Sequence, residues 1–544
     1  MQRHYAKKTM KKALSLALAF VMLLGLLSAC SVTTGGDEKK EPQKTETQQT
    51  QQSQGDTQQS TTPAAPSRTD LNLVLSSQGA TLDPHNSGQT VDLQVERQIY
   101  EGLVFADEYT NVSPRVAESW TIGADGKTYT FKLRSGVKFH NGDPVTVQDV
   151  VFSYNRAIGA AQMATYVSSI DHVEAKDDST FVIYMKEPFS AFLLYASMVN
   201  IVSEKVVTEQ GSNFGANAVD AGCGPYKLAS YDISTEIKLE AFEDYYLGAP
   251  SIKNVSFKVV TDTNTSLIAF QTGDIDFLSV PAANWAEVKA SGKYATKEHA
   301  ANNIRYLALN PINPDSPLYD KRVRQAIQYA INKEEIIALA VEGLGAEAEH
   351  IQQVGSFYGA VETSWNYKYD LAKAKDLMKA AGYENGCDIG TIQCVSATYA
   401  TAAQVIQEQL KAIGVKCEIL QGKAATMLVD WRAGNYDAIC NGHGPVFTYD
   451  FYRKYNNYTL STCFMKYDRN PEIDEVYVLD MFEKAAAETD ETKMNAMYKE
   501  LEEYLMDASC WIPLWHGVTP FAWDKALNAE TYSTYFYLYD WSWN

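Results

Sequence analysis

One stretch of the chain carries a stronger structural signal than any other, and it consists of four segments: PRVAESW (114–120), DGKTYTFKLR (125–134), GVKFHNG (136–142) and DVVFSY (149–154). In the second segment Tyr129, Phe131 and Leu133 alternate with polar residues, which is typical of a strand with one buried face. The Asn-Gly-Asp-Pro sequence at 141–144 predicts a turn, and Thr146 then opens a helix.

Similar patterns extend outward in both directions. We expect strands at Asp70–Ser76, Ile237–Leu239, Ser256–Val260, Arg305–Leu309 and Val415–Leu420. We expect helices at Asp92–Val104, from an N-cap at Asp320, at Asp370–Ala381, at Gln404–Ile413 up to Gly414, and at Glu472–Asp507 with a break near Thr489. Because strands and helices interleave and the C-terminal region is helical, the fold class is α/β.

Composition narrows the function. A length of 544 residues suggests about three domains or lobes. The chain has 67 acidic against 47 basic residues, which argues against a nucleic-acid partner, because phosphate binding needs clustered Lys and Arg. Only eight histidines occur, so a multi-histidine metal centre is not expected.

The N-terminal region has the features of an export signal. Residues 1–12 are basic, and Ala13–Leu27 is almost entirely apolar but shorter than the roughly 20 residues that span a bilayer. The stretch ends in Leu-Ser-Ala-Cys, which resembles the bacterial lipobox, with Cys30 as the lipid-attachment residue and 1–29 as the signal peptide. An ordinary signal peptide with a chance cysteine is the alternative.

The segment after Cys30 contains almost no apolar residues. Because Ser31–Arg68 is rich in Gln and Thr, it cannot bury a core, and we expect residues 30–68 to be a lipid-anchored disordered tether. The folded part beyond it should then lie at the extracytoplasmic face of the cell membrane, which the tether suggests is a Gram-positive surface. Seven further cysteines include no C-x-x-C pair, which favours buried thiols over metal or redox motifs.

Catalytic motifs are missing from the sequence. It contains no H-E-x-x-H, G-x-S-x-G, P-loop or G-x-G-x-x-G pattern, and no pair of catalytic carboxylates can be selected. The sequence therefore predicts neither an enzyme nor a cofactor.

Taken together, the four opening segments resemble the signature of the family 5 extracellular solute-binding proteins, the peptide- and nickel-type receptors of ABC importers. Further segments are similar to that family's motifs: Thr81-Leu82-Asp83-Pro84, Tyr100-Glu101-Gly102-Leu103, Gly222-Cys223-Gly224-Pro225-Tyr226, Gly273-Asp274-Ile275-Asp276, the D-x-R-V-R-x-A run at 320–326 and N-P-x-x-D at 470–474. The resemblance covers nearly all of residues 70–520.

The resemblance implies a two-lobed fold like that of periplasmic binding proteins, with an extra domain inserted near the N-terminus. Lobe I would comprise 70–92, 218–300 and 511–544, the inserted domain 93–217, and lobe II 301–510. The ligand would lie between lobes that close on a hinge, and a membrane permease with its ATPase would be the partner.

The resemblance also indicates where to look for the ligand site. In peptide-binding members a Trp and then an Asp, which pairs with the ligand's α-ammonium, follow a G-x-Y-D element, here residues 434–437. His443 occupies the Trp place and Val446 the Asp place, and Asp450 would substitute only if the loop is longer or shifted. The remaining candidates for ligand binding are Ser77, Gln78, Trp431, Tyr449, Trp515 and His516, with a core role as the alternative for the tryptophans. No metal ligands are assigned.

The expected function is capture of oligopeptides or a similar small solute by a lipid-anchored receptor of an ABC importer. The same fold with an oligosaccharide or a nickel chelate as cargo is an alternative, since aromatic residues are abundant and the Asp is missing. A surface hydrolase or a sensor without transport would be functions of a different class.

Overall fold

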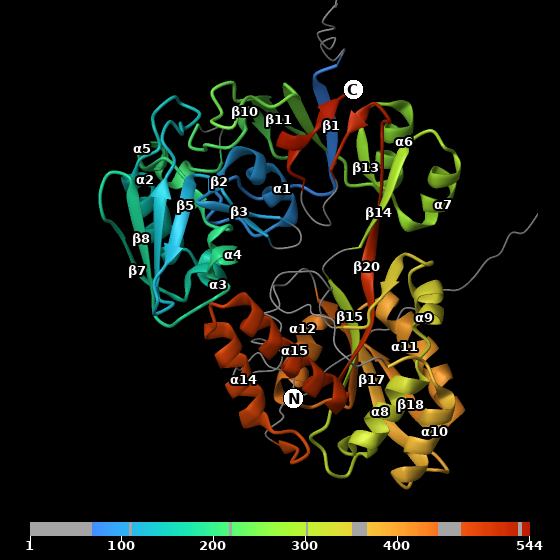
Figure 1. Cartoon of the computed structure of the whole chain (residues 1–544). Coiled ribbons are helices and arrows are strands. Elements are labelled where there is room, and N and C mark those ends of the chain that lie inside the picture. The colour runs from blue at the N-terminus through green and yellow to red at the C-terminus, as the bar shows by residue number, and fades with distance from the viewer. Residues whose placement is uncertain are drawn as a thin grey trace, which may run out of the picture. The chain divides into compact units, whose positions relative to one another are not determined.

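The computed structural model describes residues 68–107, 111–216, 220–300, 303–350, 367–443, 469–530 and 536–544. Residues 65–544 form one compact unit in which strands and helices alternate along the chain, as Figure 1 shows. Within the described ranges no helix combines the length and the hydropathy needed to cross a membrane. The α/β class predicted from the interleaved pattern is confirmed.

The first sheet has the strand order β1-β12-β11-β10. Its first two strands run parallel and the others antiparallel: β1 (Asp70–Leu75), β12 (Asn254–Val259), β11 (Glu236–Ala241) and β10 (Tyr226–Asp232). Leu71, Leu73 and Leu75 are buried in the same core as Val95 and Ile99 of helix α1 (Thr90–Ile99). The predicted domain boundary at residue 93 therefore cuts through a helix that packs with the first sheet.

The same core also receives residues from the far end of the sequence. Trp541 and Trp543 are buried among the β1 leucines, and the indole N–H of Trp543 donates to the Asp70 carbonyl oxygen over 3.0 Å. Arg68 lies 4.2 Å from the ring centroid of Trp543, in a cation–π contact. The segments around residues 70 and 543 thus complete one core together.

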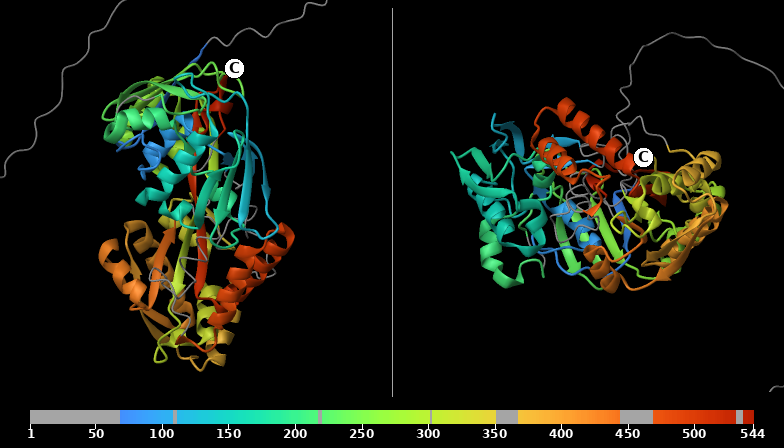
Figure 2. Two further views of the ribbon diagram at one scale, coloured as in Figure 1. Left: turned by 90° about the vertical axis from the view of Figure 1, so that its left-hand side faces the viewer. Right: turned by 90° about the horizontal axis from the view of Figure 1, so that it is seen from below.

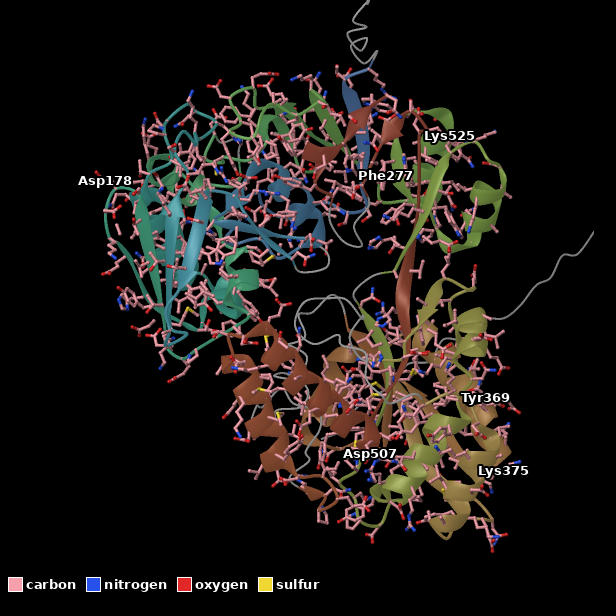
Figure 3. The ribbon with its side chains drawn as sticks, viewed as in Figure 1. Asp178, Phe277, Tyr369, Lys375, Asp507 and Lys525 are labelled. Carbon is pink, nitrogen blue, oxygen red and sulfur yellow. The ribbon has the colours of Figure 1, made fainter. Side chains whose placement is uncertain are left out.

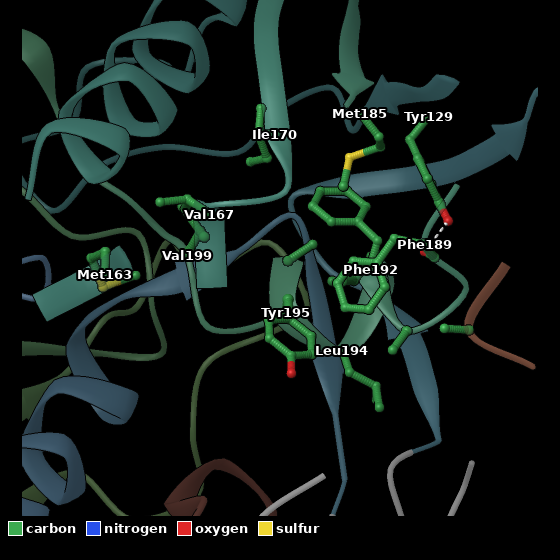
Figure 4. Packing of buried hydrophobic residues seen from close by; sticks show 14 of the residues in the cluster. Tyr129, Met163, Val167, Ile170, Met185, Phe189, Phe192, Leu194, Tyr195 and Val199 are labelled. Carbon is green, nitrogen blue, oxygen red and sulfur yellow. Dashed lines mark hydrogen bonds between the residues drawn. The ribbon is translucent and has the colours of Figure 1, made fainter. Parts of the chain in front are cut away.

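The signature stretch forms a second, antiparallel sheet with the order β5-β6-β8-β7. Its strands are β5 (Ala117–Ile122), β6 (Thr128–Leu133), β8 (Thr180–Met185) and β7 (Ile170–Ala175), and helix α2 (Val147–Gly159) accompanies them. Tyr129 and Phe131 are fully buried, as the alternation predicted. Figure 4 shows the Tyr129 hydroxyl donating to the Phe189 carbonyl oxygen over 2.8 Å, with Phe192 packed against the ring.

The third sheet has the order β13-β20-β15-β19-β17-β18. Its strands are β13 (Phe277–Ser279), β20 (Trp511–Trp523), β15 (Ile304–Leu309), β19 (Ala438–His443), β17 (Cys387–Cys394) and β18 (Val415–Gln421). β17 pairs in parallel with both β18 and β19. Two buried cores flank the strands of residues 303–510, one with α8 (Lys321–Ala330), α9 (Lys333–Ala340), α10 (Leu371–Ala380) and α11 (Ala397–Leu410), the other with α12 (Ala424–Ala433), α14 (Glu475–Ala487) and α15 (Glu491–Ala508).

Strand β20 takes part in two groups of strands. Trp511–Trp515 pairs with β15, and the following residues pair with β16 (Gly345–Glu347), β14 (Ala295–Ala300) and β13. Figures 1 and 2 show this long red strand running through the body. A second link joins the signature domain to α14, because the amide and hydroxyl of Ser190 both donate to the Ala486 carbonyl oxygen, over 2.9 and 2.8 Å.

Shorter elements connect these sheets. They are β2 (Glu101–Gly102), β3 (Val104–Ala106), β4 (Val112–Pro114), α3 (Ala164–Val167), α4 (Phe192–Ala196), β9 (Asn200–Ile201), α5 (Glu204–Gln210), α6 (Thr263–Thr272), α7 (Ala282–Ala290), β21 (Leu527–Asn528) and β22 (Ser542–Trp543).

Most helix ends follow the sequence signals. Thr146 forms a capping box with Asp149, and the side chains of Asp320 and Asp370 cap α8 and α10. The predicted break near Thr489 lies between α14 and α15. The helix predicted over Asp92–Val104 is wrong in its last part, since α1 ends at Ile99 and short strands follow.

The Thr81-Leu82-Asp83-Pro84 motif fixes the signature domain to the first sheet. Asp83 is 4% exposed and accepts two hydrogen bonds from the Arg156 guanidinium of α2, over 2.7 and 2.6 Å. Burial alone would raise the pKa of Asp83, but hydrogen bonds from Arg156 and Asn86 and the Arg156 charge outweigh it and place the pKa below 3.8.

This pair predicts a pH-dependent stability difference. At pH 7 we expect Asp83→Asn to lower the free energy of unfolding by about 3 kcal/mol, because it leaves a largely buried guanidinium without its charged partner. A carboxylate with a depressed pKa stabilises the fold above its unfolded-state pKa, so the difference should shrink below about pH 3.8, as wild-type Asp83 becomes protonated.

Urea denaturation followed by circular dichroism at several pH values measures this difference. Asp244→Asn is the matched control, because its carboxylate pairs with Lys138 at an exposed site and should contribute no more than about 0.5 kcal/mol. Equal destabilisation by both variants at pH 7 would contradict the prediction.

Candidate functional site

The first candidate surface is the carboxyl edge of the parallel pair β1 and β12, where ligands of α/β sheets commonly bind. Ser76, Ser77 and Gln78 follow β1 directly and are exposed. A cavity of about 150 Å³ opens at this edge, lined by polar residues that include Ser76, Gln94, Thr261 and Ser279. The predicted contacts Ser77 and Gln78 adjoin the cavity in sequence but are not among its lining residues, and their role stays a prediction.

Aromatic side chains close the far wall of this cavity. Phe277, labelled in Figure 3, is 2% exposed and packs against four aromatic rings with centroid distances of 4.9 to 5.6 Å: Phe521, Trp523, Phe536 and Trp541. Phe277 and Phe536 also line the cavity. The aromatic C-terminal segment that the sequence suggested as possible lining therefore contributes chiefly a rigid wall.

A second cavity, of about 240 Å³, lies between α1 and the signature domain. Its walls combine apolar and polar groups: Leu93, Glu96, Arg97, Tyr100, Glu101, Phe105, Arg115, Met163, Tyr166, Met198, Asn200 and Tyr537. A space of this size, with aromatic and thioether walls and several hydrogen-bonding groups, suits the side chain of a small polar organic ligand.

The inner wall of the second cavity is held by one buried carboxylate. Glu101 is 5% exposed and accepts hydrogen bonds from the hydroxyls of Tyr245, Tyr246 and Tyr537, over 2.5, 2.6 and 2.9 Å. The guanidinium of Arg115 lies 3.6 Å from the same carboxylate. Burial nevertheless dominates and raises the pKa of Glu101. Because its partners come from three distant segments, Glu101 acts as a structural centre for this wall.

The third candidate surface is the carboxyl edge of β17 and β19. Arg305 of β15 lies opposite Gly442 of β19 in the strand register. A Cβ added at Gly442 would overlap the Cδ of Arg305 and lie 2.8 Å from the Tyr399 hydroxyl. The Arg305 side chain therefore crosses the bare backbone of residue 442, and Tyr399, in the first turn of α11, reaches the same point.

His516 lies close to this edge. It is 7% exposed, and its Nδ1–H donates to the Asn303 carbonyl oxygen over 2.7 Å. Burial lowers the pKa of His516, and the positive charges of Lys333, Arg305 and His350 lower it further.

The two tryptophans predicted to line the site are buried. Trp431 has 0% exposure, and its indole N–H donates to the Gln393 side-chain oxygen over 2.6 Å. Trp515 is 1% exposed and packs beside Gly345. Both tryptophans hold the sheet in place from within, which was the alternative reading from the sequence.

The remaining predicted residues are only partly described. The backbone of His443 ends β19 and pairs with Ile304, close to Gly442. Tyr449, Asp450 and Cys30 lie outside the described residues. The sequence did not single out Arg305 and Tyr399, although a charged residue within the apolar run Ile-Arg-Tyr-Leu-Ala-Leu was a usable signal.

Cysteines and metal ligands add no chemistry to these surfaces. The six described cysteines carry free thiols, and all but the half-buried Cys387 are buried, as the sequence favoured. Among the residues in the described ranges, no three His, Cys, Asp or Glu side chains come together in a group that could hold a metal ion.

Comparison with known proteins agrees with this geometry. The model of the bacterial extracellular solute-binding proteins, family 5 middle, matches residues 111–464. This chain belongs to that family. A glutathione-binding protein GsiB from Pectobacterium atrosepticum is 31% identical over 64% of this chain and 68% of its own length. The GsiB of Escherichia coli K12 is 27% identical over 82% of this chain and 88% of its own length.

Solved structures show the same two-lobed fold. The unliganded open form of MppA, a periplasmic murein tripeptide binding protein, superposes with a TM-score of 0.79 at 21% identity, covering 88% of this chain and 99% of its own. HbpA2 from Haemophilus parasuis gives 0.78 at 23% identity, covering 87% of this chain and 100% of its own. Proteins of this family are substrate-binding components of ABC importers and not enzymes, as the resemblance implied.

The bare backbone at residue 442 predicts a size limit. We expect Gly442→Ala to lower the free energy of unfolding by about 1–3 kcal/mol, because the new methyl overlaps Arg305 and approaches the Ile304 carbonyl oxygen to 2.8 Å. Gly159→Ala is the control, since nothing lies within 4 Å of a Cβ there. Urea denaturation compares the two, and an unchanged midpoint for Gly442→Ala would contradict the clash.

Proposed function

We propose that this protein is a lipid-anchored receptor of an ABC importer that captures short peptides, or solutes built like them, and delivers them to a membrane permease and its ATPase. The observation that carries the proposal is the membership of a solute-binding family together with relatives named for glutathione, itself a tripeptide. As with those receptors, binding would occur between two lobes that close over the cargo.

The chemistry of the candidate surfaces supports a peptide-like cargo. A peptide carries backbone donors and acceptors, charged ends and side chains of varied polarity. The surfaces offer a cavity with hydroxyl and amide groups at the β1 edge, a cavity with aromatic and thioether walls beside α1, and Arg305 with Tyr399 at the β17–β19 edge. An oligosaccharide would favour exposed aromatic faces, but Trp431 and Trp515 are buried.

Export and anchoring rest on the sequence. The basic residues 1–12, the apolar run Ala13–Leu27 and the Leu-Ser-Ala-Cys end support lipidation at Cys30. A tether over 30–68 would then let the folded body stay near the membrane, within reach of the permease.

Native purification provides the first test. The protein purified without denaturant should carry peptides, which mass spectrometry of the released small molecules will show as a mixture or as one dominant species. Calorimetry with tripeptides should then give saturable binding. Recovery of a single sugar or a nickel chelate, with no peptide binding, would reject the peptide proposal while keeping the receptor role.

Lipidation has a separate test. In the native host, Cys30→Ser should abolish incorporation of a labelled fatty acid and move the protein from the membrane fraction to the medium. Ser31→Ala is the control, because it leaves the attachment thiol in place. Continued acyl labelling of Cys30→Ser would show that this cysteine is not the attachment residue.

A further inference from the structure

The carboxyl edge of β17 and β19 brings a cation and a hydroxyl donor to one point. Arg305 and Tyr399 are 94 positions apart in the sequence, yet both reach the point where a Cβ of Gly442 would lie. The register explains the approach, because Arg305 pairs across the ladder with Gly442 and α11 packs beside β19. An alanine at residue 442 would keep them apart.

The position of this pair in the fold is that of a ligand contact. β17 and β19 run parallel, so their carboxyl ends meet at the same edge of the sheet. Groups gathered at such an edge face the crevice in which α/β proteins bind their ligands. Arg305 is only partly buried, so its guanidinium is not enclosed within the core.

The surrounding charge favours an anion. The charged groups that act on the nearby His516 are Lys333, Arg305 and His350, all of them basic. Tyr399 is also subject to the Arg305 charge, which opposes the effect of burial on its pKa. A guanidinium presents its N–H groups in a planar fork that matches a carboxylate, and a tyrosine hydroxyl adds one more donor.

We infer that Arg305 and Tyr399 form a subsite for a carboxylate of the cargo, the C-terminal carboxylate in the case of a peptide. The inference rests on the proposed function and specifies which end of the cargo lobe II recognises. Arg305 supplies the charge and the fork, Tyr399 supplies a third hydrogen bond, and Gly442 provides the space in which the two meet.

The test uses the full chain in detergent and matched pairs of ligands. Trialanine and reduced glutathione are each compared with their C-terminal carboxamides by calorimetry. We expect the wild-type protein to bind the acid about 10- to 100-fold more tightly than the amide, since a site built around charged hydrogen bonds rejects a partner that lacks the charge.

Three variants and a control assign the effect to residues. Arg305→Gln should abolish the preference for the acid, Arg305→Lys should retain part of it, and Tyr399→Phe should reduce it several-fold. Lys411→Gln, at the opposite end of α11, makes the same change of charge and should leave the preference unchanged. Thermal unfolding checks that each variant is folded, and Tyr399→Phe retains a test if an Arg305 variant is not.

Each outcome decides the inference. Acid preference that is lost with Arg305 and weakened with Tyr399 supports the subsite. Equal binding of acid and amide overturns it and leaves the peptide receptor in place. Preference that survives in Arg305→Gln and Tyr399→Phe overturns the assignment to these residues. If neither peptide nor its amide binds, while native purification yields another solute, the inference and the peptide function both fail.

Discussion

The pairing of strand β20 is the constraint on which the arrangement of the sheets depends. Thirteen residues, Trp511–Trp523, supply backbone partners to β15 and β16 and then to β14 and β13. Two prolines interrupt its donors, because Pro513 and Pro520 have no N–H. The ladder with β15 shifts register next to Pro513, so that Arg305 stands opposite Trp515 while Tyr306 stands opposite Pro513. This local irregularity fixes where the first residues of β15 point, and hence where Arg305 meets β19.

A second constraint acts on the other side of the molecule. Glu101 draws hydroxyls from Tyr245, Tyr246 and Tyr537 into one buried group with Arg115 beside it. Each tyrosine satisfies part of a carboxylate that would otherwise be costly to bury. The short strand that begins at Glu101 is therefore held by tertiary hydrogen bonds, and the same bonds shape one wall of the larger cavity.

Local patterns predicted the elements well where one face is buried and the ends carry their own signals. The alternation around Tyr129 and the caps at Thr146, Asp320 and Asp370 needed no knowledge of distant residues. The helix expected over Asp92–Val104 was extended too far, because the burial of Glu101 among tyrosines more than 140 positions away overrides local helical periodicity. The site was harder to predict, since Arg305, Tyr399 and Gly442 meet only through strand pairing, and aromatic residues such as Trp431 look alike in a core and in a pocket.

The contact between Trp543 and Asp70 joins residues 473 positions apart. Phe521, Trp523, Trp541 and Trp543 belong to the same core as the leucines of β1, so that core stays incomplete until these aromatic side chains reach it. A chain that emerges from a membrane pore in the order of synthesis exposes β1 early and Trp543 late. In that order the first sheet would present unshielded leucines through most of translocation, and its closure would be the final folding event, leaving an interval in which extracytoplasmic chaperones and proteases compete for the nascent receptor.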